Sequence, residues 1–152
     1  DREALQRRIQ AILDSEESRE ARLQAVCEAL KTSVPHYDWV GFYLVDPEAE
    51  EELILGPYAG APTEHTRIKF GQGICGQAAS TKETFIIQDV TQETNYLSCS
   101  PEVKSEIVLP IFSEGQLVGE LDIDSHDLAP FSEGDQRLLD RICAWVAPHI
   151  VG

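Results

Sequence analysis

The stretch WVGFYLV, from Trp39 to Val45, constrains the fold most, because apolar and β-favouring residues occupy both parities of the predicted strand. A strand with one solvent-exposed face alternates apolar with polar side chains instead. We therefore expect a central strand that is buried on both faces. The turn DPEAEE and the stretch ELILGPY follow it, which predicts an antiparallel hairpin.

Helical periodicity appears at both ends of the chain. Apolar residues fall on one helical face between Arg2 and Asp14, and a second apolar stripe begins at Leu23 and ends before Pro35. Near the C-terminus, Ser132 is followed by acidic residues and then by a third apolar stripe, which predicts a capped helix.

Further strands are predicted in the middle of the chain, at TFIIQDV, EIVLPIF and LVGELDIDS, and the glycine-rich stretch RIKFGQGICGQAAS predicts a tight turn that opens a short helix. The resulting fold class is α+β, with one domain over residues 1–152. We expect helices at 2–34 and 132–147 to pack on one face of a central antiparallel sheet formed within residues 37–125.

Composition and charge exclude several classes of function. The 152 residues are 42% hydrophobic and 26% charged, which is typical of a soluble globular protein. Twelve basic residues against 27 acidic ones give a net charge of −15, which disfavours nucleic acids and anionic membranes as partners. No apolar run is long enough for a transmembrane helix, and we expect a cytoplasmic location.

The four cysteines fall into different sequence environments. Cys27 and Cys143 lie on apolar helical stripes, which predicts small core residues. Cys75 opens the predicted short helix behind two glycines, where backbone amides and the helix dipole favour the thiolate. Cys99 stands between two serines in a polar loop, so it is a candidate for an accessible, reactive thiol. Nothing indicates secretion, so we expect reduced thiols.

Carboxylates converge at one end of the predicted sheet. In GELDIDS, strand alternation places Glu120, Asp122 and Asp124 on the same face, and we interpret Glu120 as part of a solvated outer surface. Glu106 opens the preceding strand, and a short SEGQ turn brings it close to Asp122 and Asp124. Such a cluster raises at least one carboxyl pKa, so it can bind an ammonium group or hold a proton for donation.

Two aromatic residues flank a glycine on one face of the first strand. Trp39, Gly41 and Tyr43 share that face, and the glycine leaves a gap between the two rings. Ordinary packing and the wall of a small-ligand pocket both agree with this pattern.

The ordered motifs WVGFYL, LILGPYAG, RIKFGQGICGQAA, FIIQDV, CSPEVKSEIVLPI and GELDIDS resemble the free methionine-(R)-sulfoxide reductases, which are built on a GAF domain. The resemblance implies reduction of free L-methionine-(R)-sulfoxide, with Cys99 as the nucleophile that becomes a sulfenic acid and Cys75 as the residue that resolves it as a disulfide. It implies a substrate pocket formed by Trp39, Tyr43, Glu106, Asp122 and Asp124. It also implies no bound cofactor, electrons from thioredoxin or a similar dithiol, and a homodimer.

One position departs from that family. A third cysteine usually lies ten residues before Cys75, and the stretch EHTRI places His65 there instead. A two-cysteine enzyme and a non-catalytic GAF module that senses a small molecule or its own oxidation both remain open. A metal centre of His65, Cys75 and Cys99, with His36 or His126, is a third alternative, although its irregular spacings disfavour it and we expect no metal.

Overall fold

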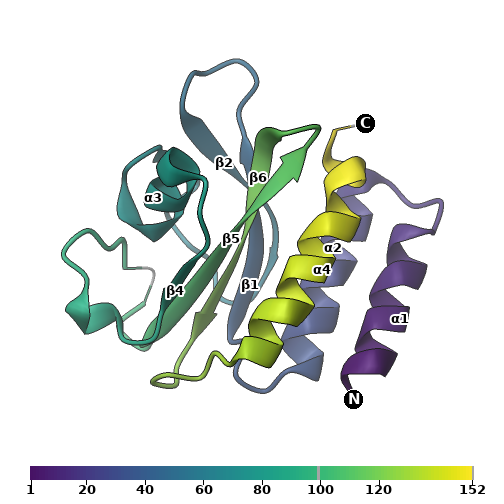
Figure 1. Cartoon of the computed structure of the whole chain (residues 1–152), viewed down its shortest axis with the longest axis horizontal. Helices are drawn as coiled ribbons and strands as arrows, with labels where there is room; N and C mark the ends of the chain where they lie inside the picture. The colour runs from purple at the N-terminus through teal and green to yellow at the C-terminus, as the bar shows by residue number, and fades with distance from the viewer. Residues whose placement is uncertain (99, 152) are drawn as a thin grey trace.

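The computed structural model describes residues 1–98 and 100–151 and contains a six-stranded sheet with helices on both faces (Figure 1). The strand order is β3-β2-β1-β6-β5-β4, and every neighbouring pair is antiparallel. The elements are α1 (Arg2–Leu13), α2 (Arg19–Ser33), β1 (Trp39–Val45), β2 (Glu52–Ala59), β3 (Arg67–Lys69), α3 (Gly73–Thr81), β4 (Phe85–Ile87), the 3₁₀ turn η1 (Val90–Gln92), β5 (Ser105–Ser113), β6 (Gln116–Ser125) and α4 (Glu133–Ile150).

Strand β1 occupies the central position that its sequence predicts. It pairs with β2 on one side and β6 on the other, and its first five residues are buried. Hairpins β1–β2 and β5–β6 confirm the predicted connections. Sheet, helices and antiparallel pairing together confirm the predicted α+β fold class.

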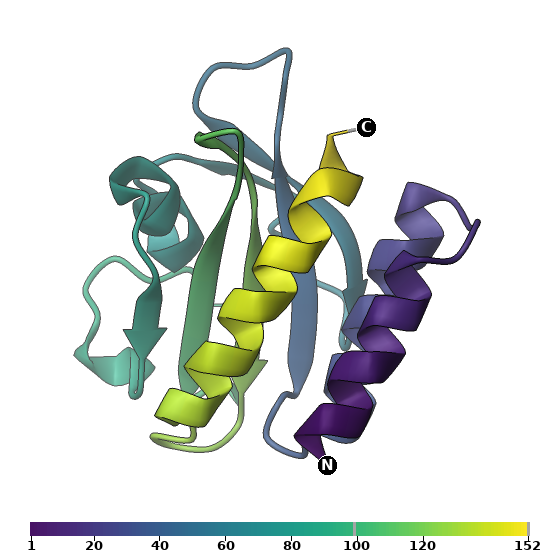
Figure 2. The same cartoon turned by 45° about the vertical axis from the view of Figure 1, so that its right-hand side comes forward.

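Helices α2 and α4 lie directly on one face of the sheet, whereas α1 packs against both of them on the side away from the strands (Figures 1 and 2). Their apolar stripes and one face of the strands form the larger hydrophobic core, which includes Cys27 and Cys143 as predicted. Helix α4 continues through Pro148 to Ile150, three residues beyond the predicted end at 147. Among the residues described, no helix combines the length and apolar character that a membrane crossing requires.

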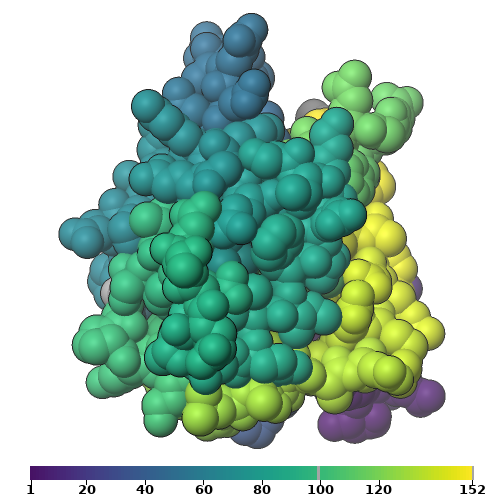
Figure 3. Space-filling view, turned by 60° about the vertical axis from the view of Figure 1, so that its left-hand side comes forward, coloured from purple at the N-terminus to yellow at the C-terminus, as the bar shows by residue number. Residues whose placement is uncertain are grey.

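The opposite face of the sheet is covered by α3 and by loops within residues 60–98, seen in teal and green in Figure 3. A second, smaller core lies beneath this cover and includes Trp39, Tyr43, Ile74, Cys75 and Val108. The predicted short helix is confirmed as α3. Strand β3, by contrast, was not predicted from the sequence. This second face is where the candidate site lies.

Candidate functional site

Strand register gathers four acidic side chains on the face beneath α3. Glu106 pairs with Asp124, which confirms the prediction that the start of β5 meets the end of β6. Asp122 lies between Val108 on β5 and Gly41 on β1. Glu106, Asp122, Asp124 and Glu120 expose only 6%, 3%, 2% and 0% of their surface. Four carboxyl groups are thus removed from water within a few residues of one another.

The interpretation of Glu120 as a solvated surface residue is wrong. Its side chain is completely buried, and neither carboxyl oxygen has a hydrogen-bond partner among the described residues. Alternation placed it correctly on the face of Asp122 and Asp124, but α3 and the second core cover that face. A carboxyl group buried in this way is costly when ionised.

Burial raises the pKa of each of the three β6 carboxyls. Desolvation is the largest cause, and the charge of Asp122 raises the pKa values of Glu120 and Asp124 further. Hydrogen bonding with Glu106 lowers the pKa values of Asp122 and Asp124 in part. Among the described residues, Oδ1 of Asp122 and Oδ1 of Asp124 have no hydrogen-bond partner. The cluster therefore either retains protons or receives a cation.

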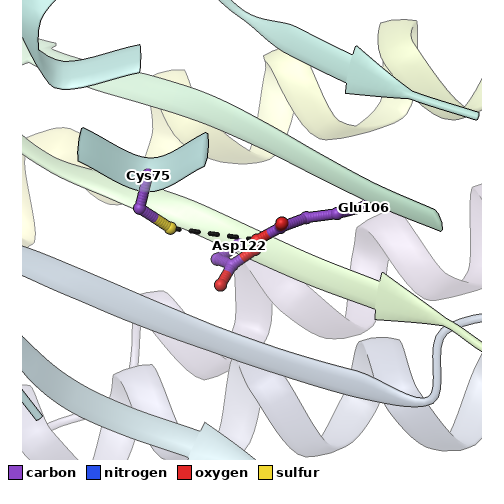
Figure 4. A group of neighbouring side chains, drawn as sticks. All are labelled: Cys75, Glu106 and Asp122. Carbon is purple, nitrogen blue, oxygen red and sulfur yellow. Dashed lines mark hydrogen bonds between the residues drawn. The ribbon is translucent and has the colours of Figure 1, made fainter. Parts of the chain in front are cut away.

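Cys75 approaches this cluster from the first turn of α3, with its sulfur directed at the carboxylates (Figure 4). Its Sγ lies 4.0 Å from Oε2 of Glu106, and Cys75, Glu106 and Asp122 bring their ligand atoms within 4.8 Å of one another. Burial, followed by the charges of the acidic residues, raises the pKa of the thiol well above its usual 9.0. The expectation that the helix N-terminus favours the thiolate is therefore wrong, because burial and four carboxyls outweigh the dipole.

The aromatic residues of β1 are packed and also border the site. A side chain at Gly41 would place its Cβ 2.3 Å from the Trp39 ring, so that ring itself fills the predicted gap. Trp39 stacks on Tyr58 at 5.4 Å between ring centroids and donates from Nε1 to the carbonyl of Ala61 at 2.9 Å. Tyr43 is 1% exposed and lines the cavity described next.

A cavity of about 10 Å³ lies between α3, the covering loops and the carboxylates. This volume accommodates roughly one water molecule. The sequence did not indicate Ile68, Ile74 and Leu97 as part of its wall, since apolar residues in short elements and loops carry no periodic signal. The lining residues are Tyr43, His65, Ile68, Ile74, Cys75, Leu97, Glu106 and Asp122.

Two loops over the cavity are joined by His65. Its Nε2 donates to the carbonyl of Ser98 at 2.9 Å, and its own carbonyl accepts a hydrogen bond from the Tyr43 hydroxyl at 2.8 Å. Asn95 fixes the second loop to the turn before α3, with its side chain bonding the backbone of Gly71 and Gly73. These contacts close the cavity above the carboxylates.

Cys99, the predicted nucleophile, lies outside the described residues, directly after Ser98 in the sequence. Two histidines of the alternative metal centre do not line the cavity that contains Cys75. His36 forms a hydrogen bond with Asp135 at the start of α4, and His126 lies beside Asp38. Among the described residues, the group that brings metal-ligating atoms together is Cys75, Glu106 and Asp122.

Comparisons with known proteins agree with this geometry. The GAF domain family matches residues 18–150. GAF domain-containing protein A of Dictyostelium discoideum is 42% identical over 134 residues, which are 88% of this chain and 82% of the relative. The free methionine-R-sulfoxide reductase of Saccharomyces cerevisiae is 41% identical over 118 residues, 77% of this chain and 65% of the yeast protein.

A solved structure extends the similarity from sequence to fold. The X-ray structure of free methionine-R-sulfoxide reductase from Neisseria meningitidis, in complex with its substrate, superposes with a TM-score of 0.90 at 36% identity. The match covers 98% of this chain and 87% of that one. The chain is therefore a member of the GAF-domain free methionine-(R)-sulfoxide reductase family.

Proposed function

We propose that this protein reduces free L-methionine-(R)-sulfoxide to methionine. The observation that carries the proposal is the buried cluster of Glu106, Asp122 and Asp124 beside a thiol and a small closed cavity. The names of the yeast and Neisseria relatives support the same activity.

The carboxylates would recognise the free amino group of the substrate. An ammonium ion donates charge-assisted hydrogen bonds, and Oδ1 of Asp122 and Oδ1 of Asp124 are buried acceptors without a hydrogen-bond partner among the described residues. A methionine sulfoxide residue within a peptide carries an acylated, uncharged nitrogen in place of the ammonium. Binding it would leave these carboxylates uncompensated, so the site would select the free amino acid.

The other end of the substrate would lie against β1, with Tyr43 and Trp39 next to the methyl sulfoxide. The closed cavity of about 10 Å³ is too small for an amino acid. Substrate entry would therefore require the loops joined by the His65–Ser98 hydrogen bond to separate.

The chemistry would begin at Cys99. Its thiolate attacks the sulfoxide sulfur. One carboxyl of the cluster, that of Glu106 or Asp124, would keep its proton for donation to the oxygen, and the other carboxylates would bind the ammonium. The protonated oxygen then transfers to Sγ of Cys99 as the sulfur–oxygen bond of the substrate breaks. Methionine leaves with its sulfur reduced by two electrons, and Cys99 becomes a sulfenic acid.

Cys75 would then resolve the sulfenic acid. The two side chains condense, water leaves, and a Cys75–Cys99 disulfide forms. A dithiol of the thioredoxin type reduces this disulfide by exchange and returns both thiols to the protein. Burial and the neighbouring carboxylates raise the pKa of Cys75 and disfavour its thiolate, which supports Cys99 as the residue that attacks the sulfoxide first.

The direct test couples NADPH, thioredoxin reductase and thioredoxin to each epimer of free methionine sulfoxide. We expect NADPH oxidation with the R epimer, none with the S epimer, and none with the Cys99→Ser variant. Absence of turnover by the wild-type protein, or full turnover by Cys99→Ser, would contradict the proposal.

A non-catalytic sensor is the second candidate, favoured by His65 at the position of the family's third cysteine and by the closed cavity. A sensor would be thermally stabilised by methionine sulfoxide without consuming NADPH. The coupled assay therefore separates the two functions.

A further inference from the structure

We propose that Cys75, Glu106 and Asp122 also form a binding site for a thiophilic divalent cation such as Zn²⁺. Metal binding would be a separate property from sulfoxide reduction, although both would use part of the same pocket. Three features support it: the spacing of the ligand atoms, the buried carboxyl oxygens without a hydrogen-bond partner beside them among the described residues, and the size of the cavity.

The spacing suits a tetrahedral ion. Sγ of Cys75 and one carboxyl oxygen each from Glu106 and Asp122 lie within 4.8 Å of one another (Figure 4). Zn–S and Zn–O bonds of about 2.3 and 2.0 Å place neighbouring ligand atoms roughly 3.3–3.5 Å apart. The three side chains need to approach one another by on the order of 1 Å, which torsions of the two carboxyl groups supply. The ligands come from α3, β5 and β6, so ordered elements position all of them.

The local charge favours a cation. Oδ1 of Asp122 is buried and without a hydrogen-bond partner among the described residues, as are Oδ1 of Asp124 and both carboxyl oxygens of Glu120. Within the same part of the chain, neither lysine nor arginine forms a salt bridge to these three residues. A bound divalent ion would compensate the charge directly and occupy the free acceptor of Asp122.

The thiol selects the type of ion. A cysteine ligand favours Zn²⁺ and Cd²⁺ over Mg²⁺ and Ca²⁺, which prefer oxygen ligands and larger coordination shells. Binding would release the thiol proton of Cys75. The cavity of about 10 Å³ holds one water or one small ion without loop opening, so the ion needs less rearrangement than an amino acid does.

Metal binding and substrate binding would exclude each other. The cation and the substrate ammonium would both use Glu106 and Asp122, and a metal-bound Cys75 cannot enter a disulfide. This inhibitory consequence rests on the proposed function, whereas metal binding itself does not.

The test is a titration of the reduced protein with Cd²⁺, in which the ultraviolet absorption of the cadmium–thiolate bond measures binding. We expect one equivalent to bind, Zn²⁺ to displace it, and excess Mg²⁺ to leave it in place. The absorption is lost in Cys75→Ser and retained in Cys99→Ser. Glu106→Gln and Asp122→Asn weaken binding at least tenfold, whereas the exposed Glu102→Gln leaves it unchanged.

Retention of the absorption in Cys75→Ser, its loss in Cys99→Ser, or displacement by Mg²⁺ would overturn the site. Equal affinity of Glu106→Gln, Asp122→Asn and Glu102→Gln would do the same. Cadmium NMR of the wild-type protein provides a readout that needs no variant. A chemical shift typical of one sulfur ligand agrees with the site, and a shift typical of two or of none contradicts it. Because these measurements need no turnover, their failure is distinguishable from failure of the reductase proposal.

Discussion

At the scale of single residues, His65 links the two loops that close the site. Its imidazole donates to the carbonyl of Ser98, and its backbone accepts from Tyr43. Ser98 directly precedes Cys99 in the sequence. The His65 side chain can therefore position the loop that leads to the proposed nucleophile.

We predict that His65→Ala lowers kcat/KM in the coupled assay at least tenfold while the melting temperature changes little, since the ring is not part of either core. His65→Gln, whose amide can donate to the same carbonyl, should restore part of the activity. The control is His149→Ala on α4, on the opposite face of the sheet. Equal activity of His65→Ala and His149→Ala would contradict this role.

Glu120 gives a second prediction at this scale, concerning stability and pH. Burial and the charge of Asp122 raise its pKa in the folded protein above the usual 4.5. The folded state then binds a proton more tightly than the unfolded state does, so Glu120 makes stability fall as pH rises above about 4.5. The amide of glutamine cannot ionise and can donate to neighbouring carboxylates.

We therefore expect Glu120→Gln to raise the melting temperature at pH 8 by roughly 2–4 °C, equivalent to about 1 kcal/mol in a domain of this size. The stability of the variant should also depend less on pH above 4.5. Thermal unfolding across a pH series measures both effects, with the exposed Glu83→Gln as control. An unchanged pH dependence would show that Glu120 does not titrate in this range.

At the scale of elements, α4 begins with a capping box that also joins the helical layer to the chain before β1. Ser132 and Asp135 exchange side-chain and backbone hydrogen bonds, and Asp135 accepts further bonds from Tyr37 and His36. Burial alone would raise the pKa of Asp135, but the hydrogen bonds from Ser132 and Tyr37 hold it at about 2. The stabilisation from Asp135 is therefore complete above the usual pKa of 3.8 and is lost as pH falls towards 2.

Asp135→Asn should lower the unfolding free energy at pH 7 by about 1–3 kcal/mol, the cost of a lost cap and charged hydrogen bonds. The difference from wild type should shrink between pH 4 and 2. Chemical denaturation at several pH values measures this, with Asp140→Asn on the same helix as control. Wild-type stability of Asp135→Asn at pH 7 would contradict the capping role.

The bounds of individual strands and helices show which elements the sequence can predict and which it cannot. Strand β1 could be bounded correctly because seven consecutive residues favour a strand with both faces buried. Strand β3 has three residues with a single buried one, Ile68, and this is too little for a periodic signal. The predicted end of α4 at 147 is too early, since the helix continues through Pro148 to Ile150 although proline has no N–H to donate to the preceding turn.

At the scale of the whole molecule, the two faces of the sheet differ in the kind of side chain that they bury. One face packs against α2 and α4 in an apolar core to which α1 contributes from outside, and the other face carries buried carboxyls beneath α3 and two loops. Strand alternation placed Glu120 and Asp122 on one face, but only the tertiary fold shows that this face is covered. The same limit applies to Cys75, because a helix dipole is visible in the sequence and carboxyls contributed by β5 and β6 are not.

The central claim is that buried carboxylates select a free amino acid sulfoxide for reduction, and one comparison tests it most directly. The coupled assay is run with free L-methionine-(R)-sulfoxide and with its N-acetyl derivative, which has the same sulfoxide but no ammonium group. We predict that kcat/KM favours the free amino acid by at least about a hundredfold, because the acylated nitrogen leaves Glu106, Asp122 and Asp124 uncompensated. Equal kcat/KM values for the two compounds would contradict the account.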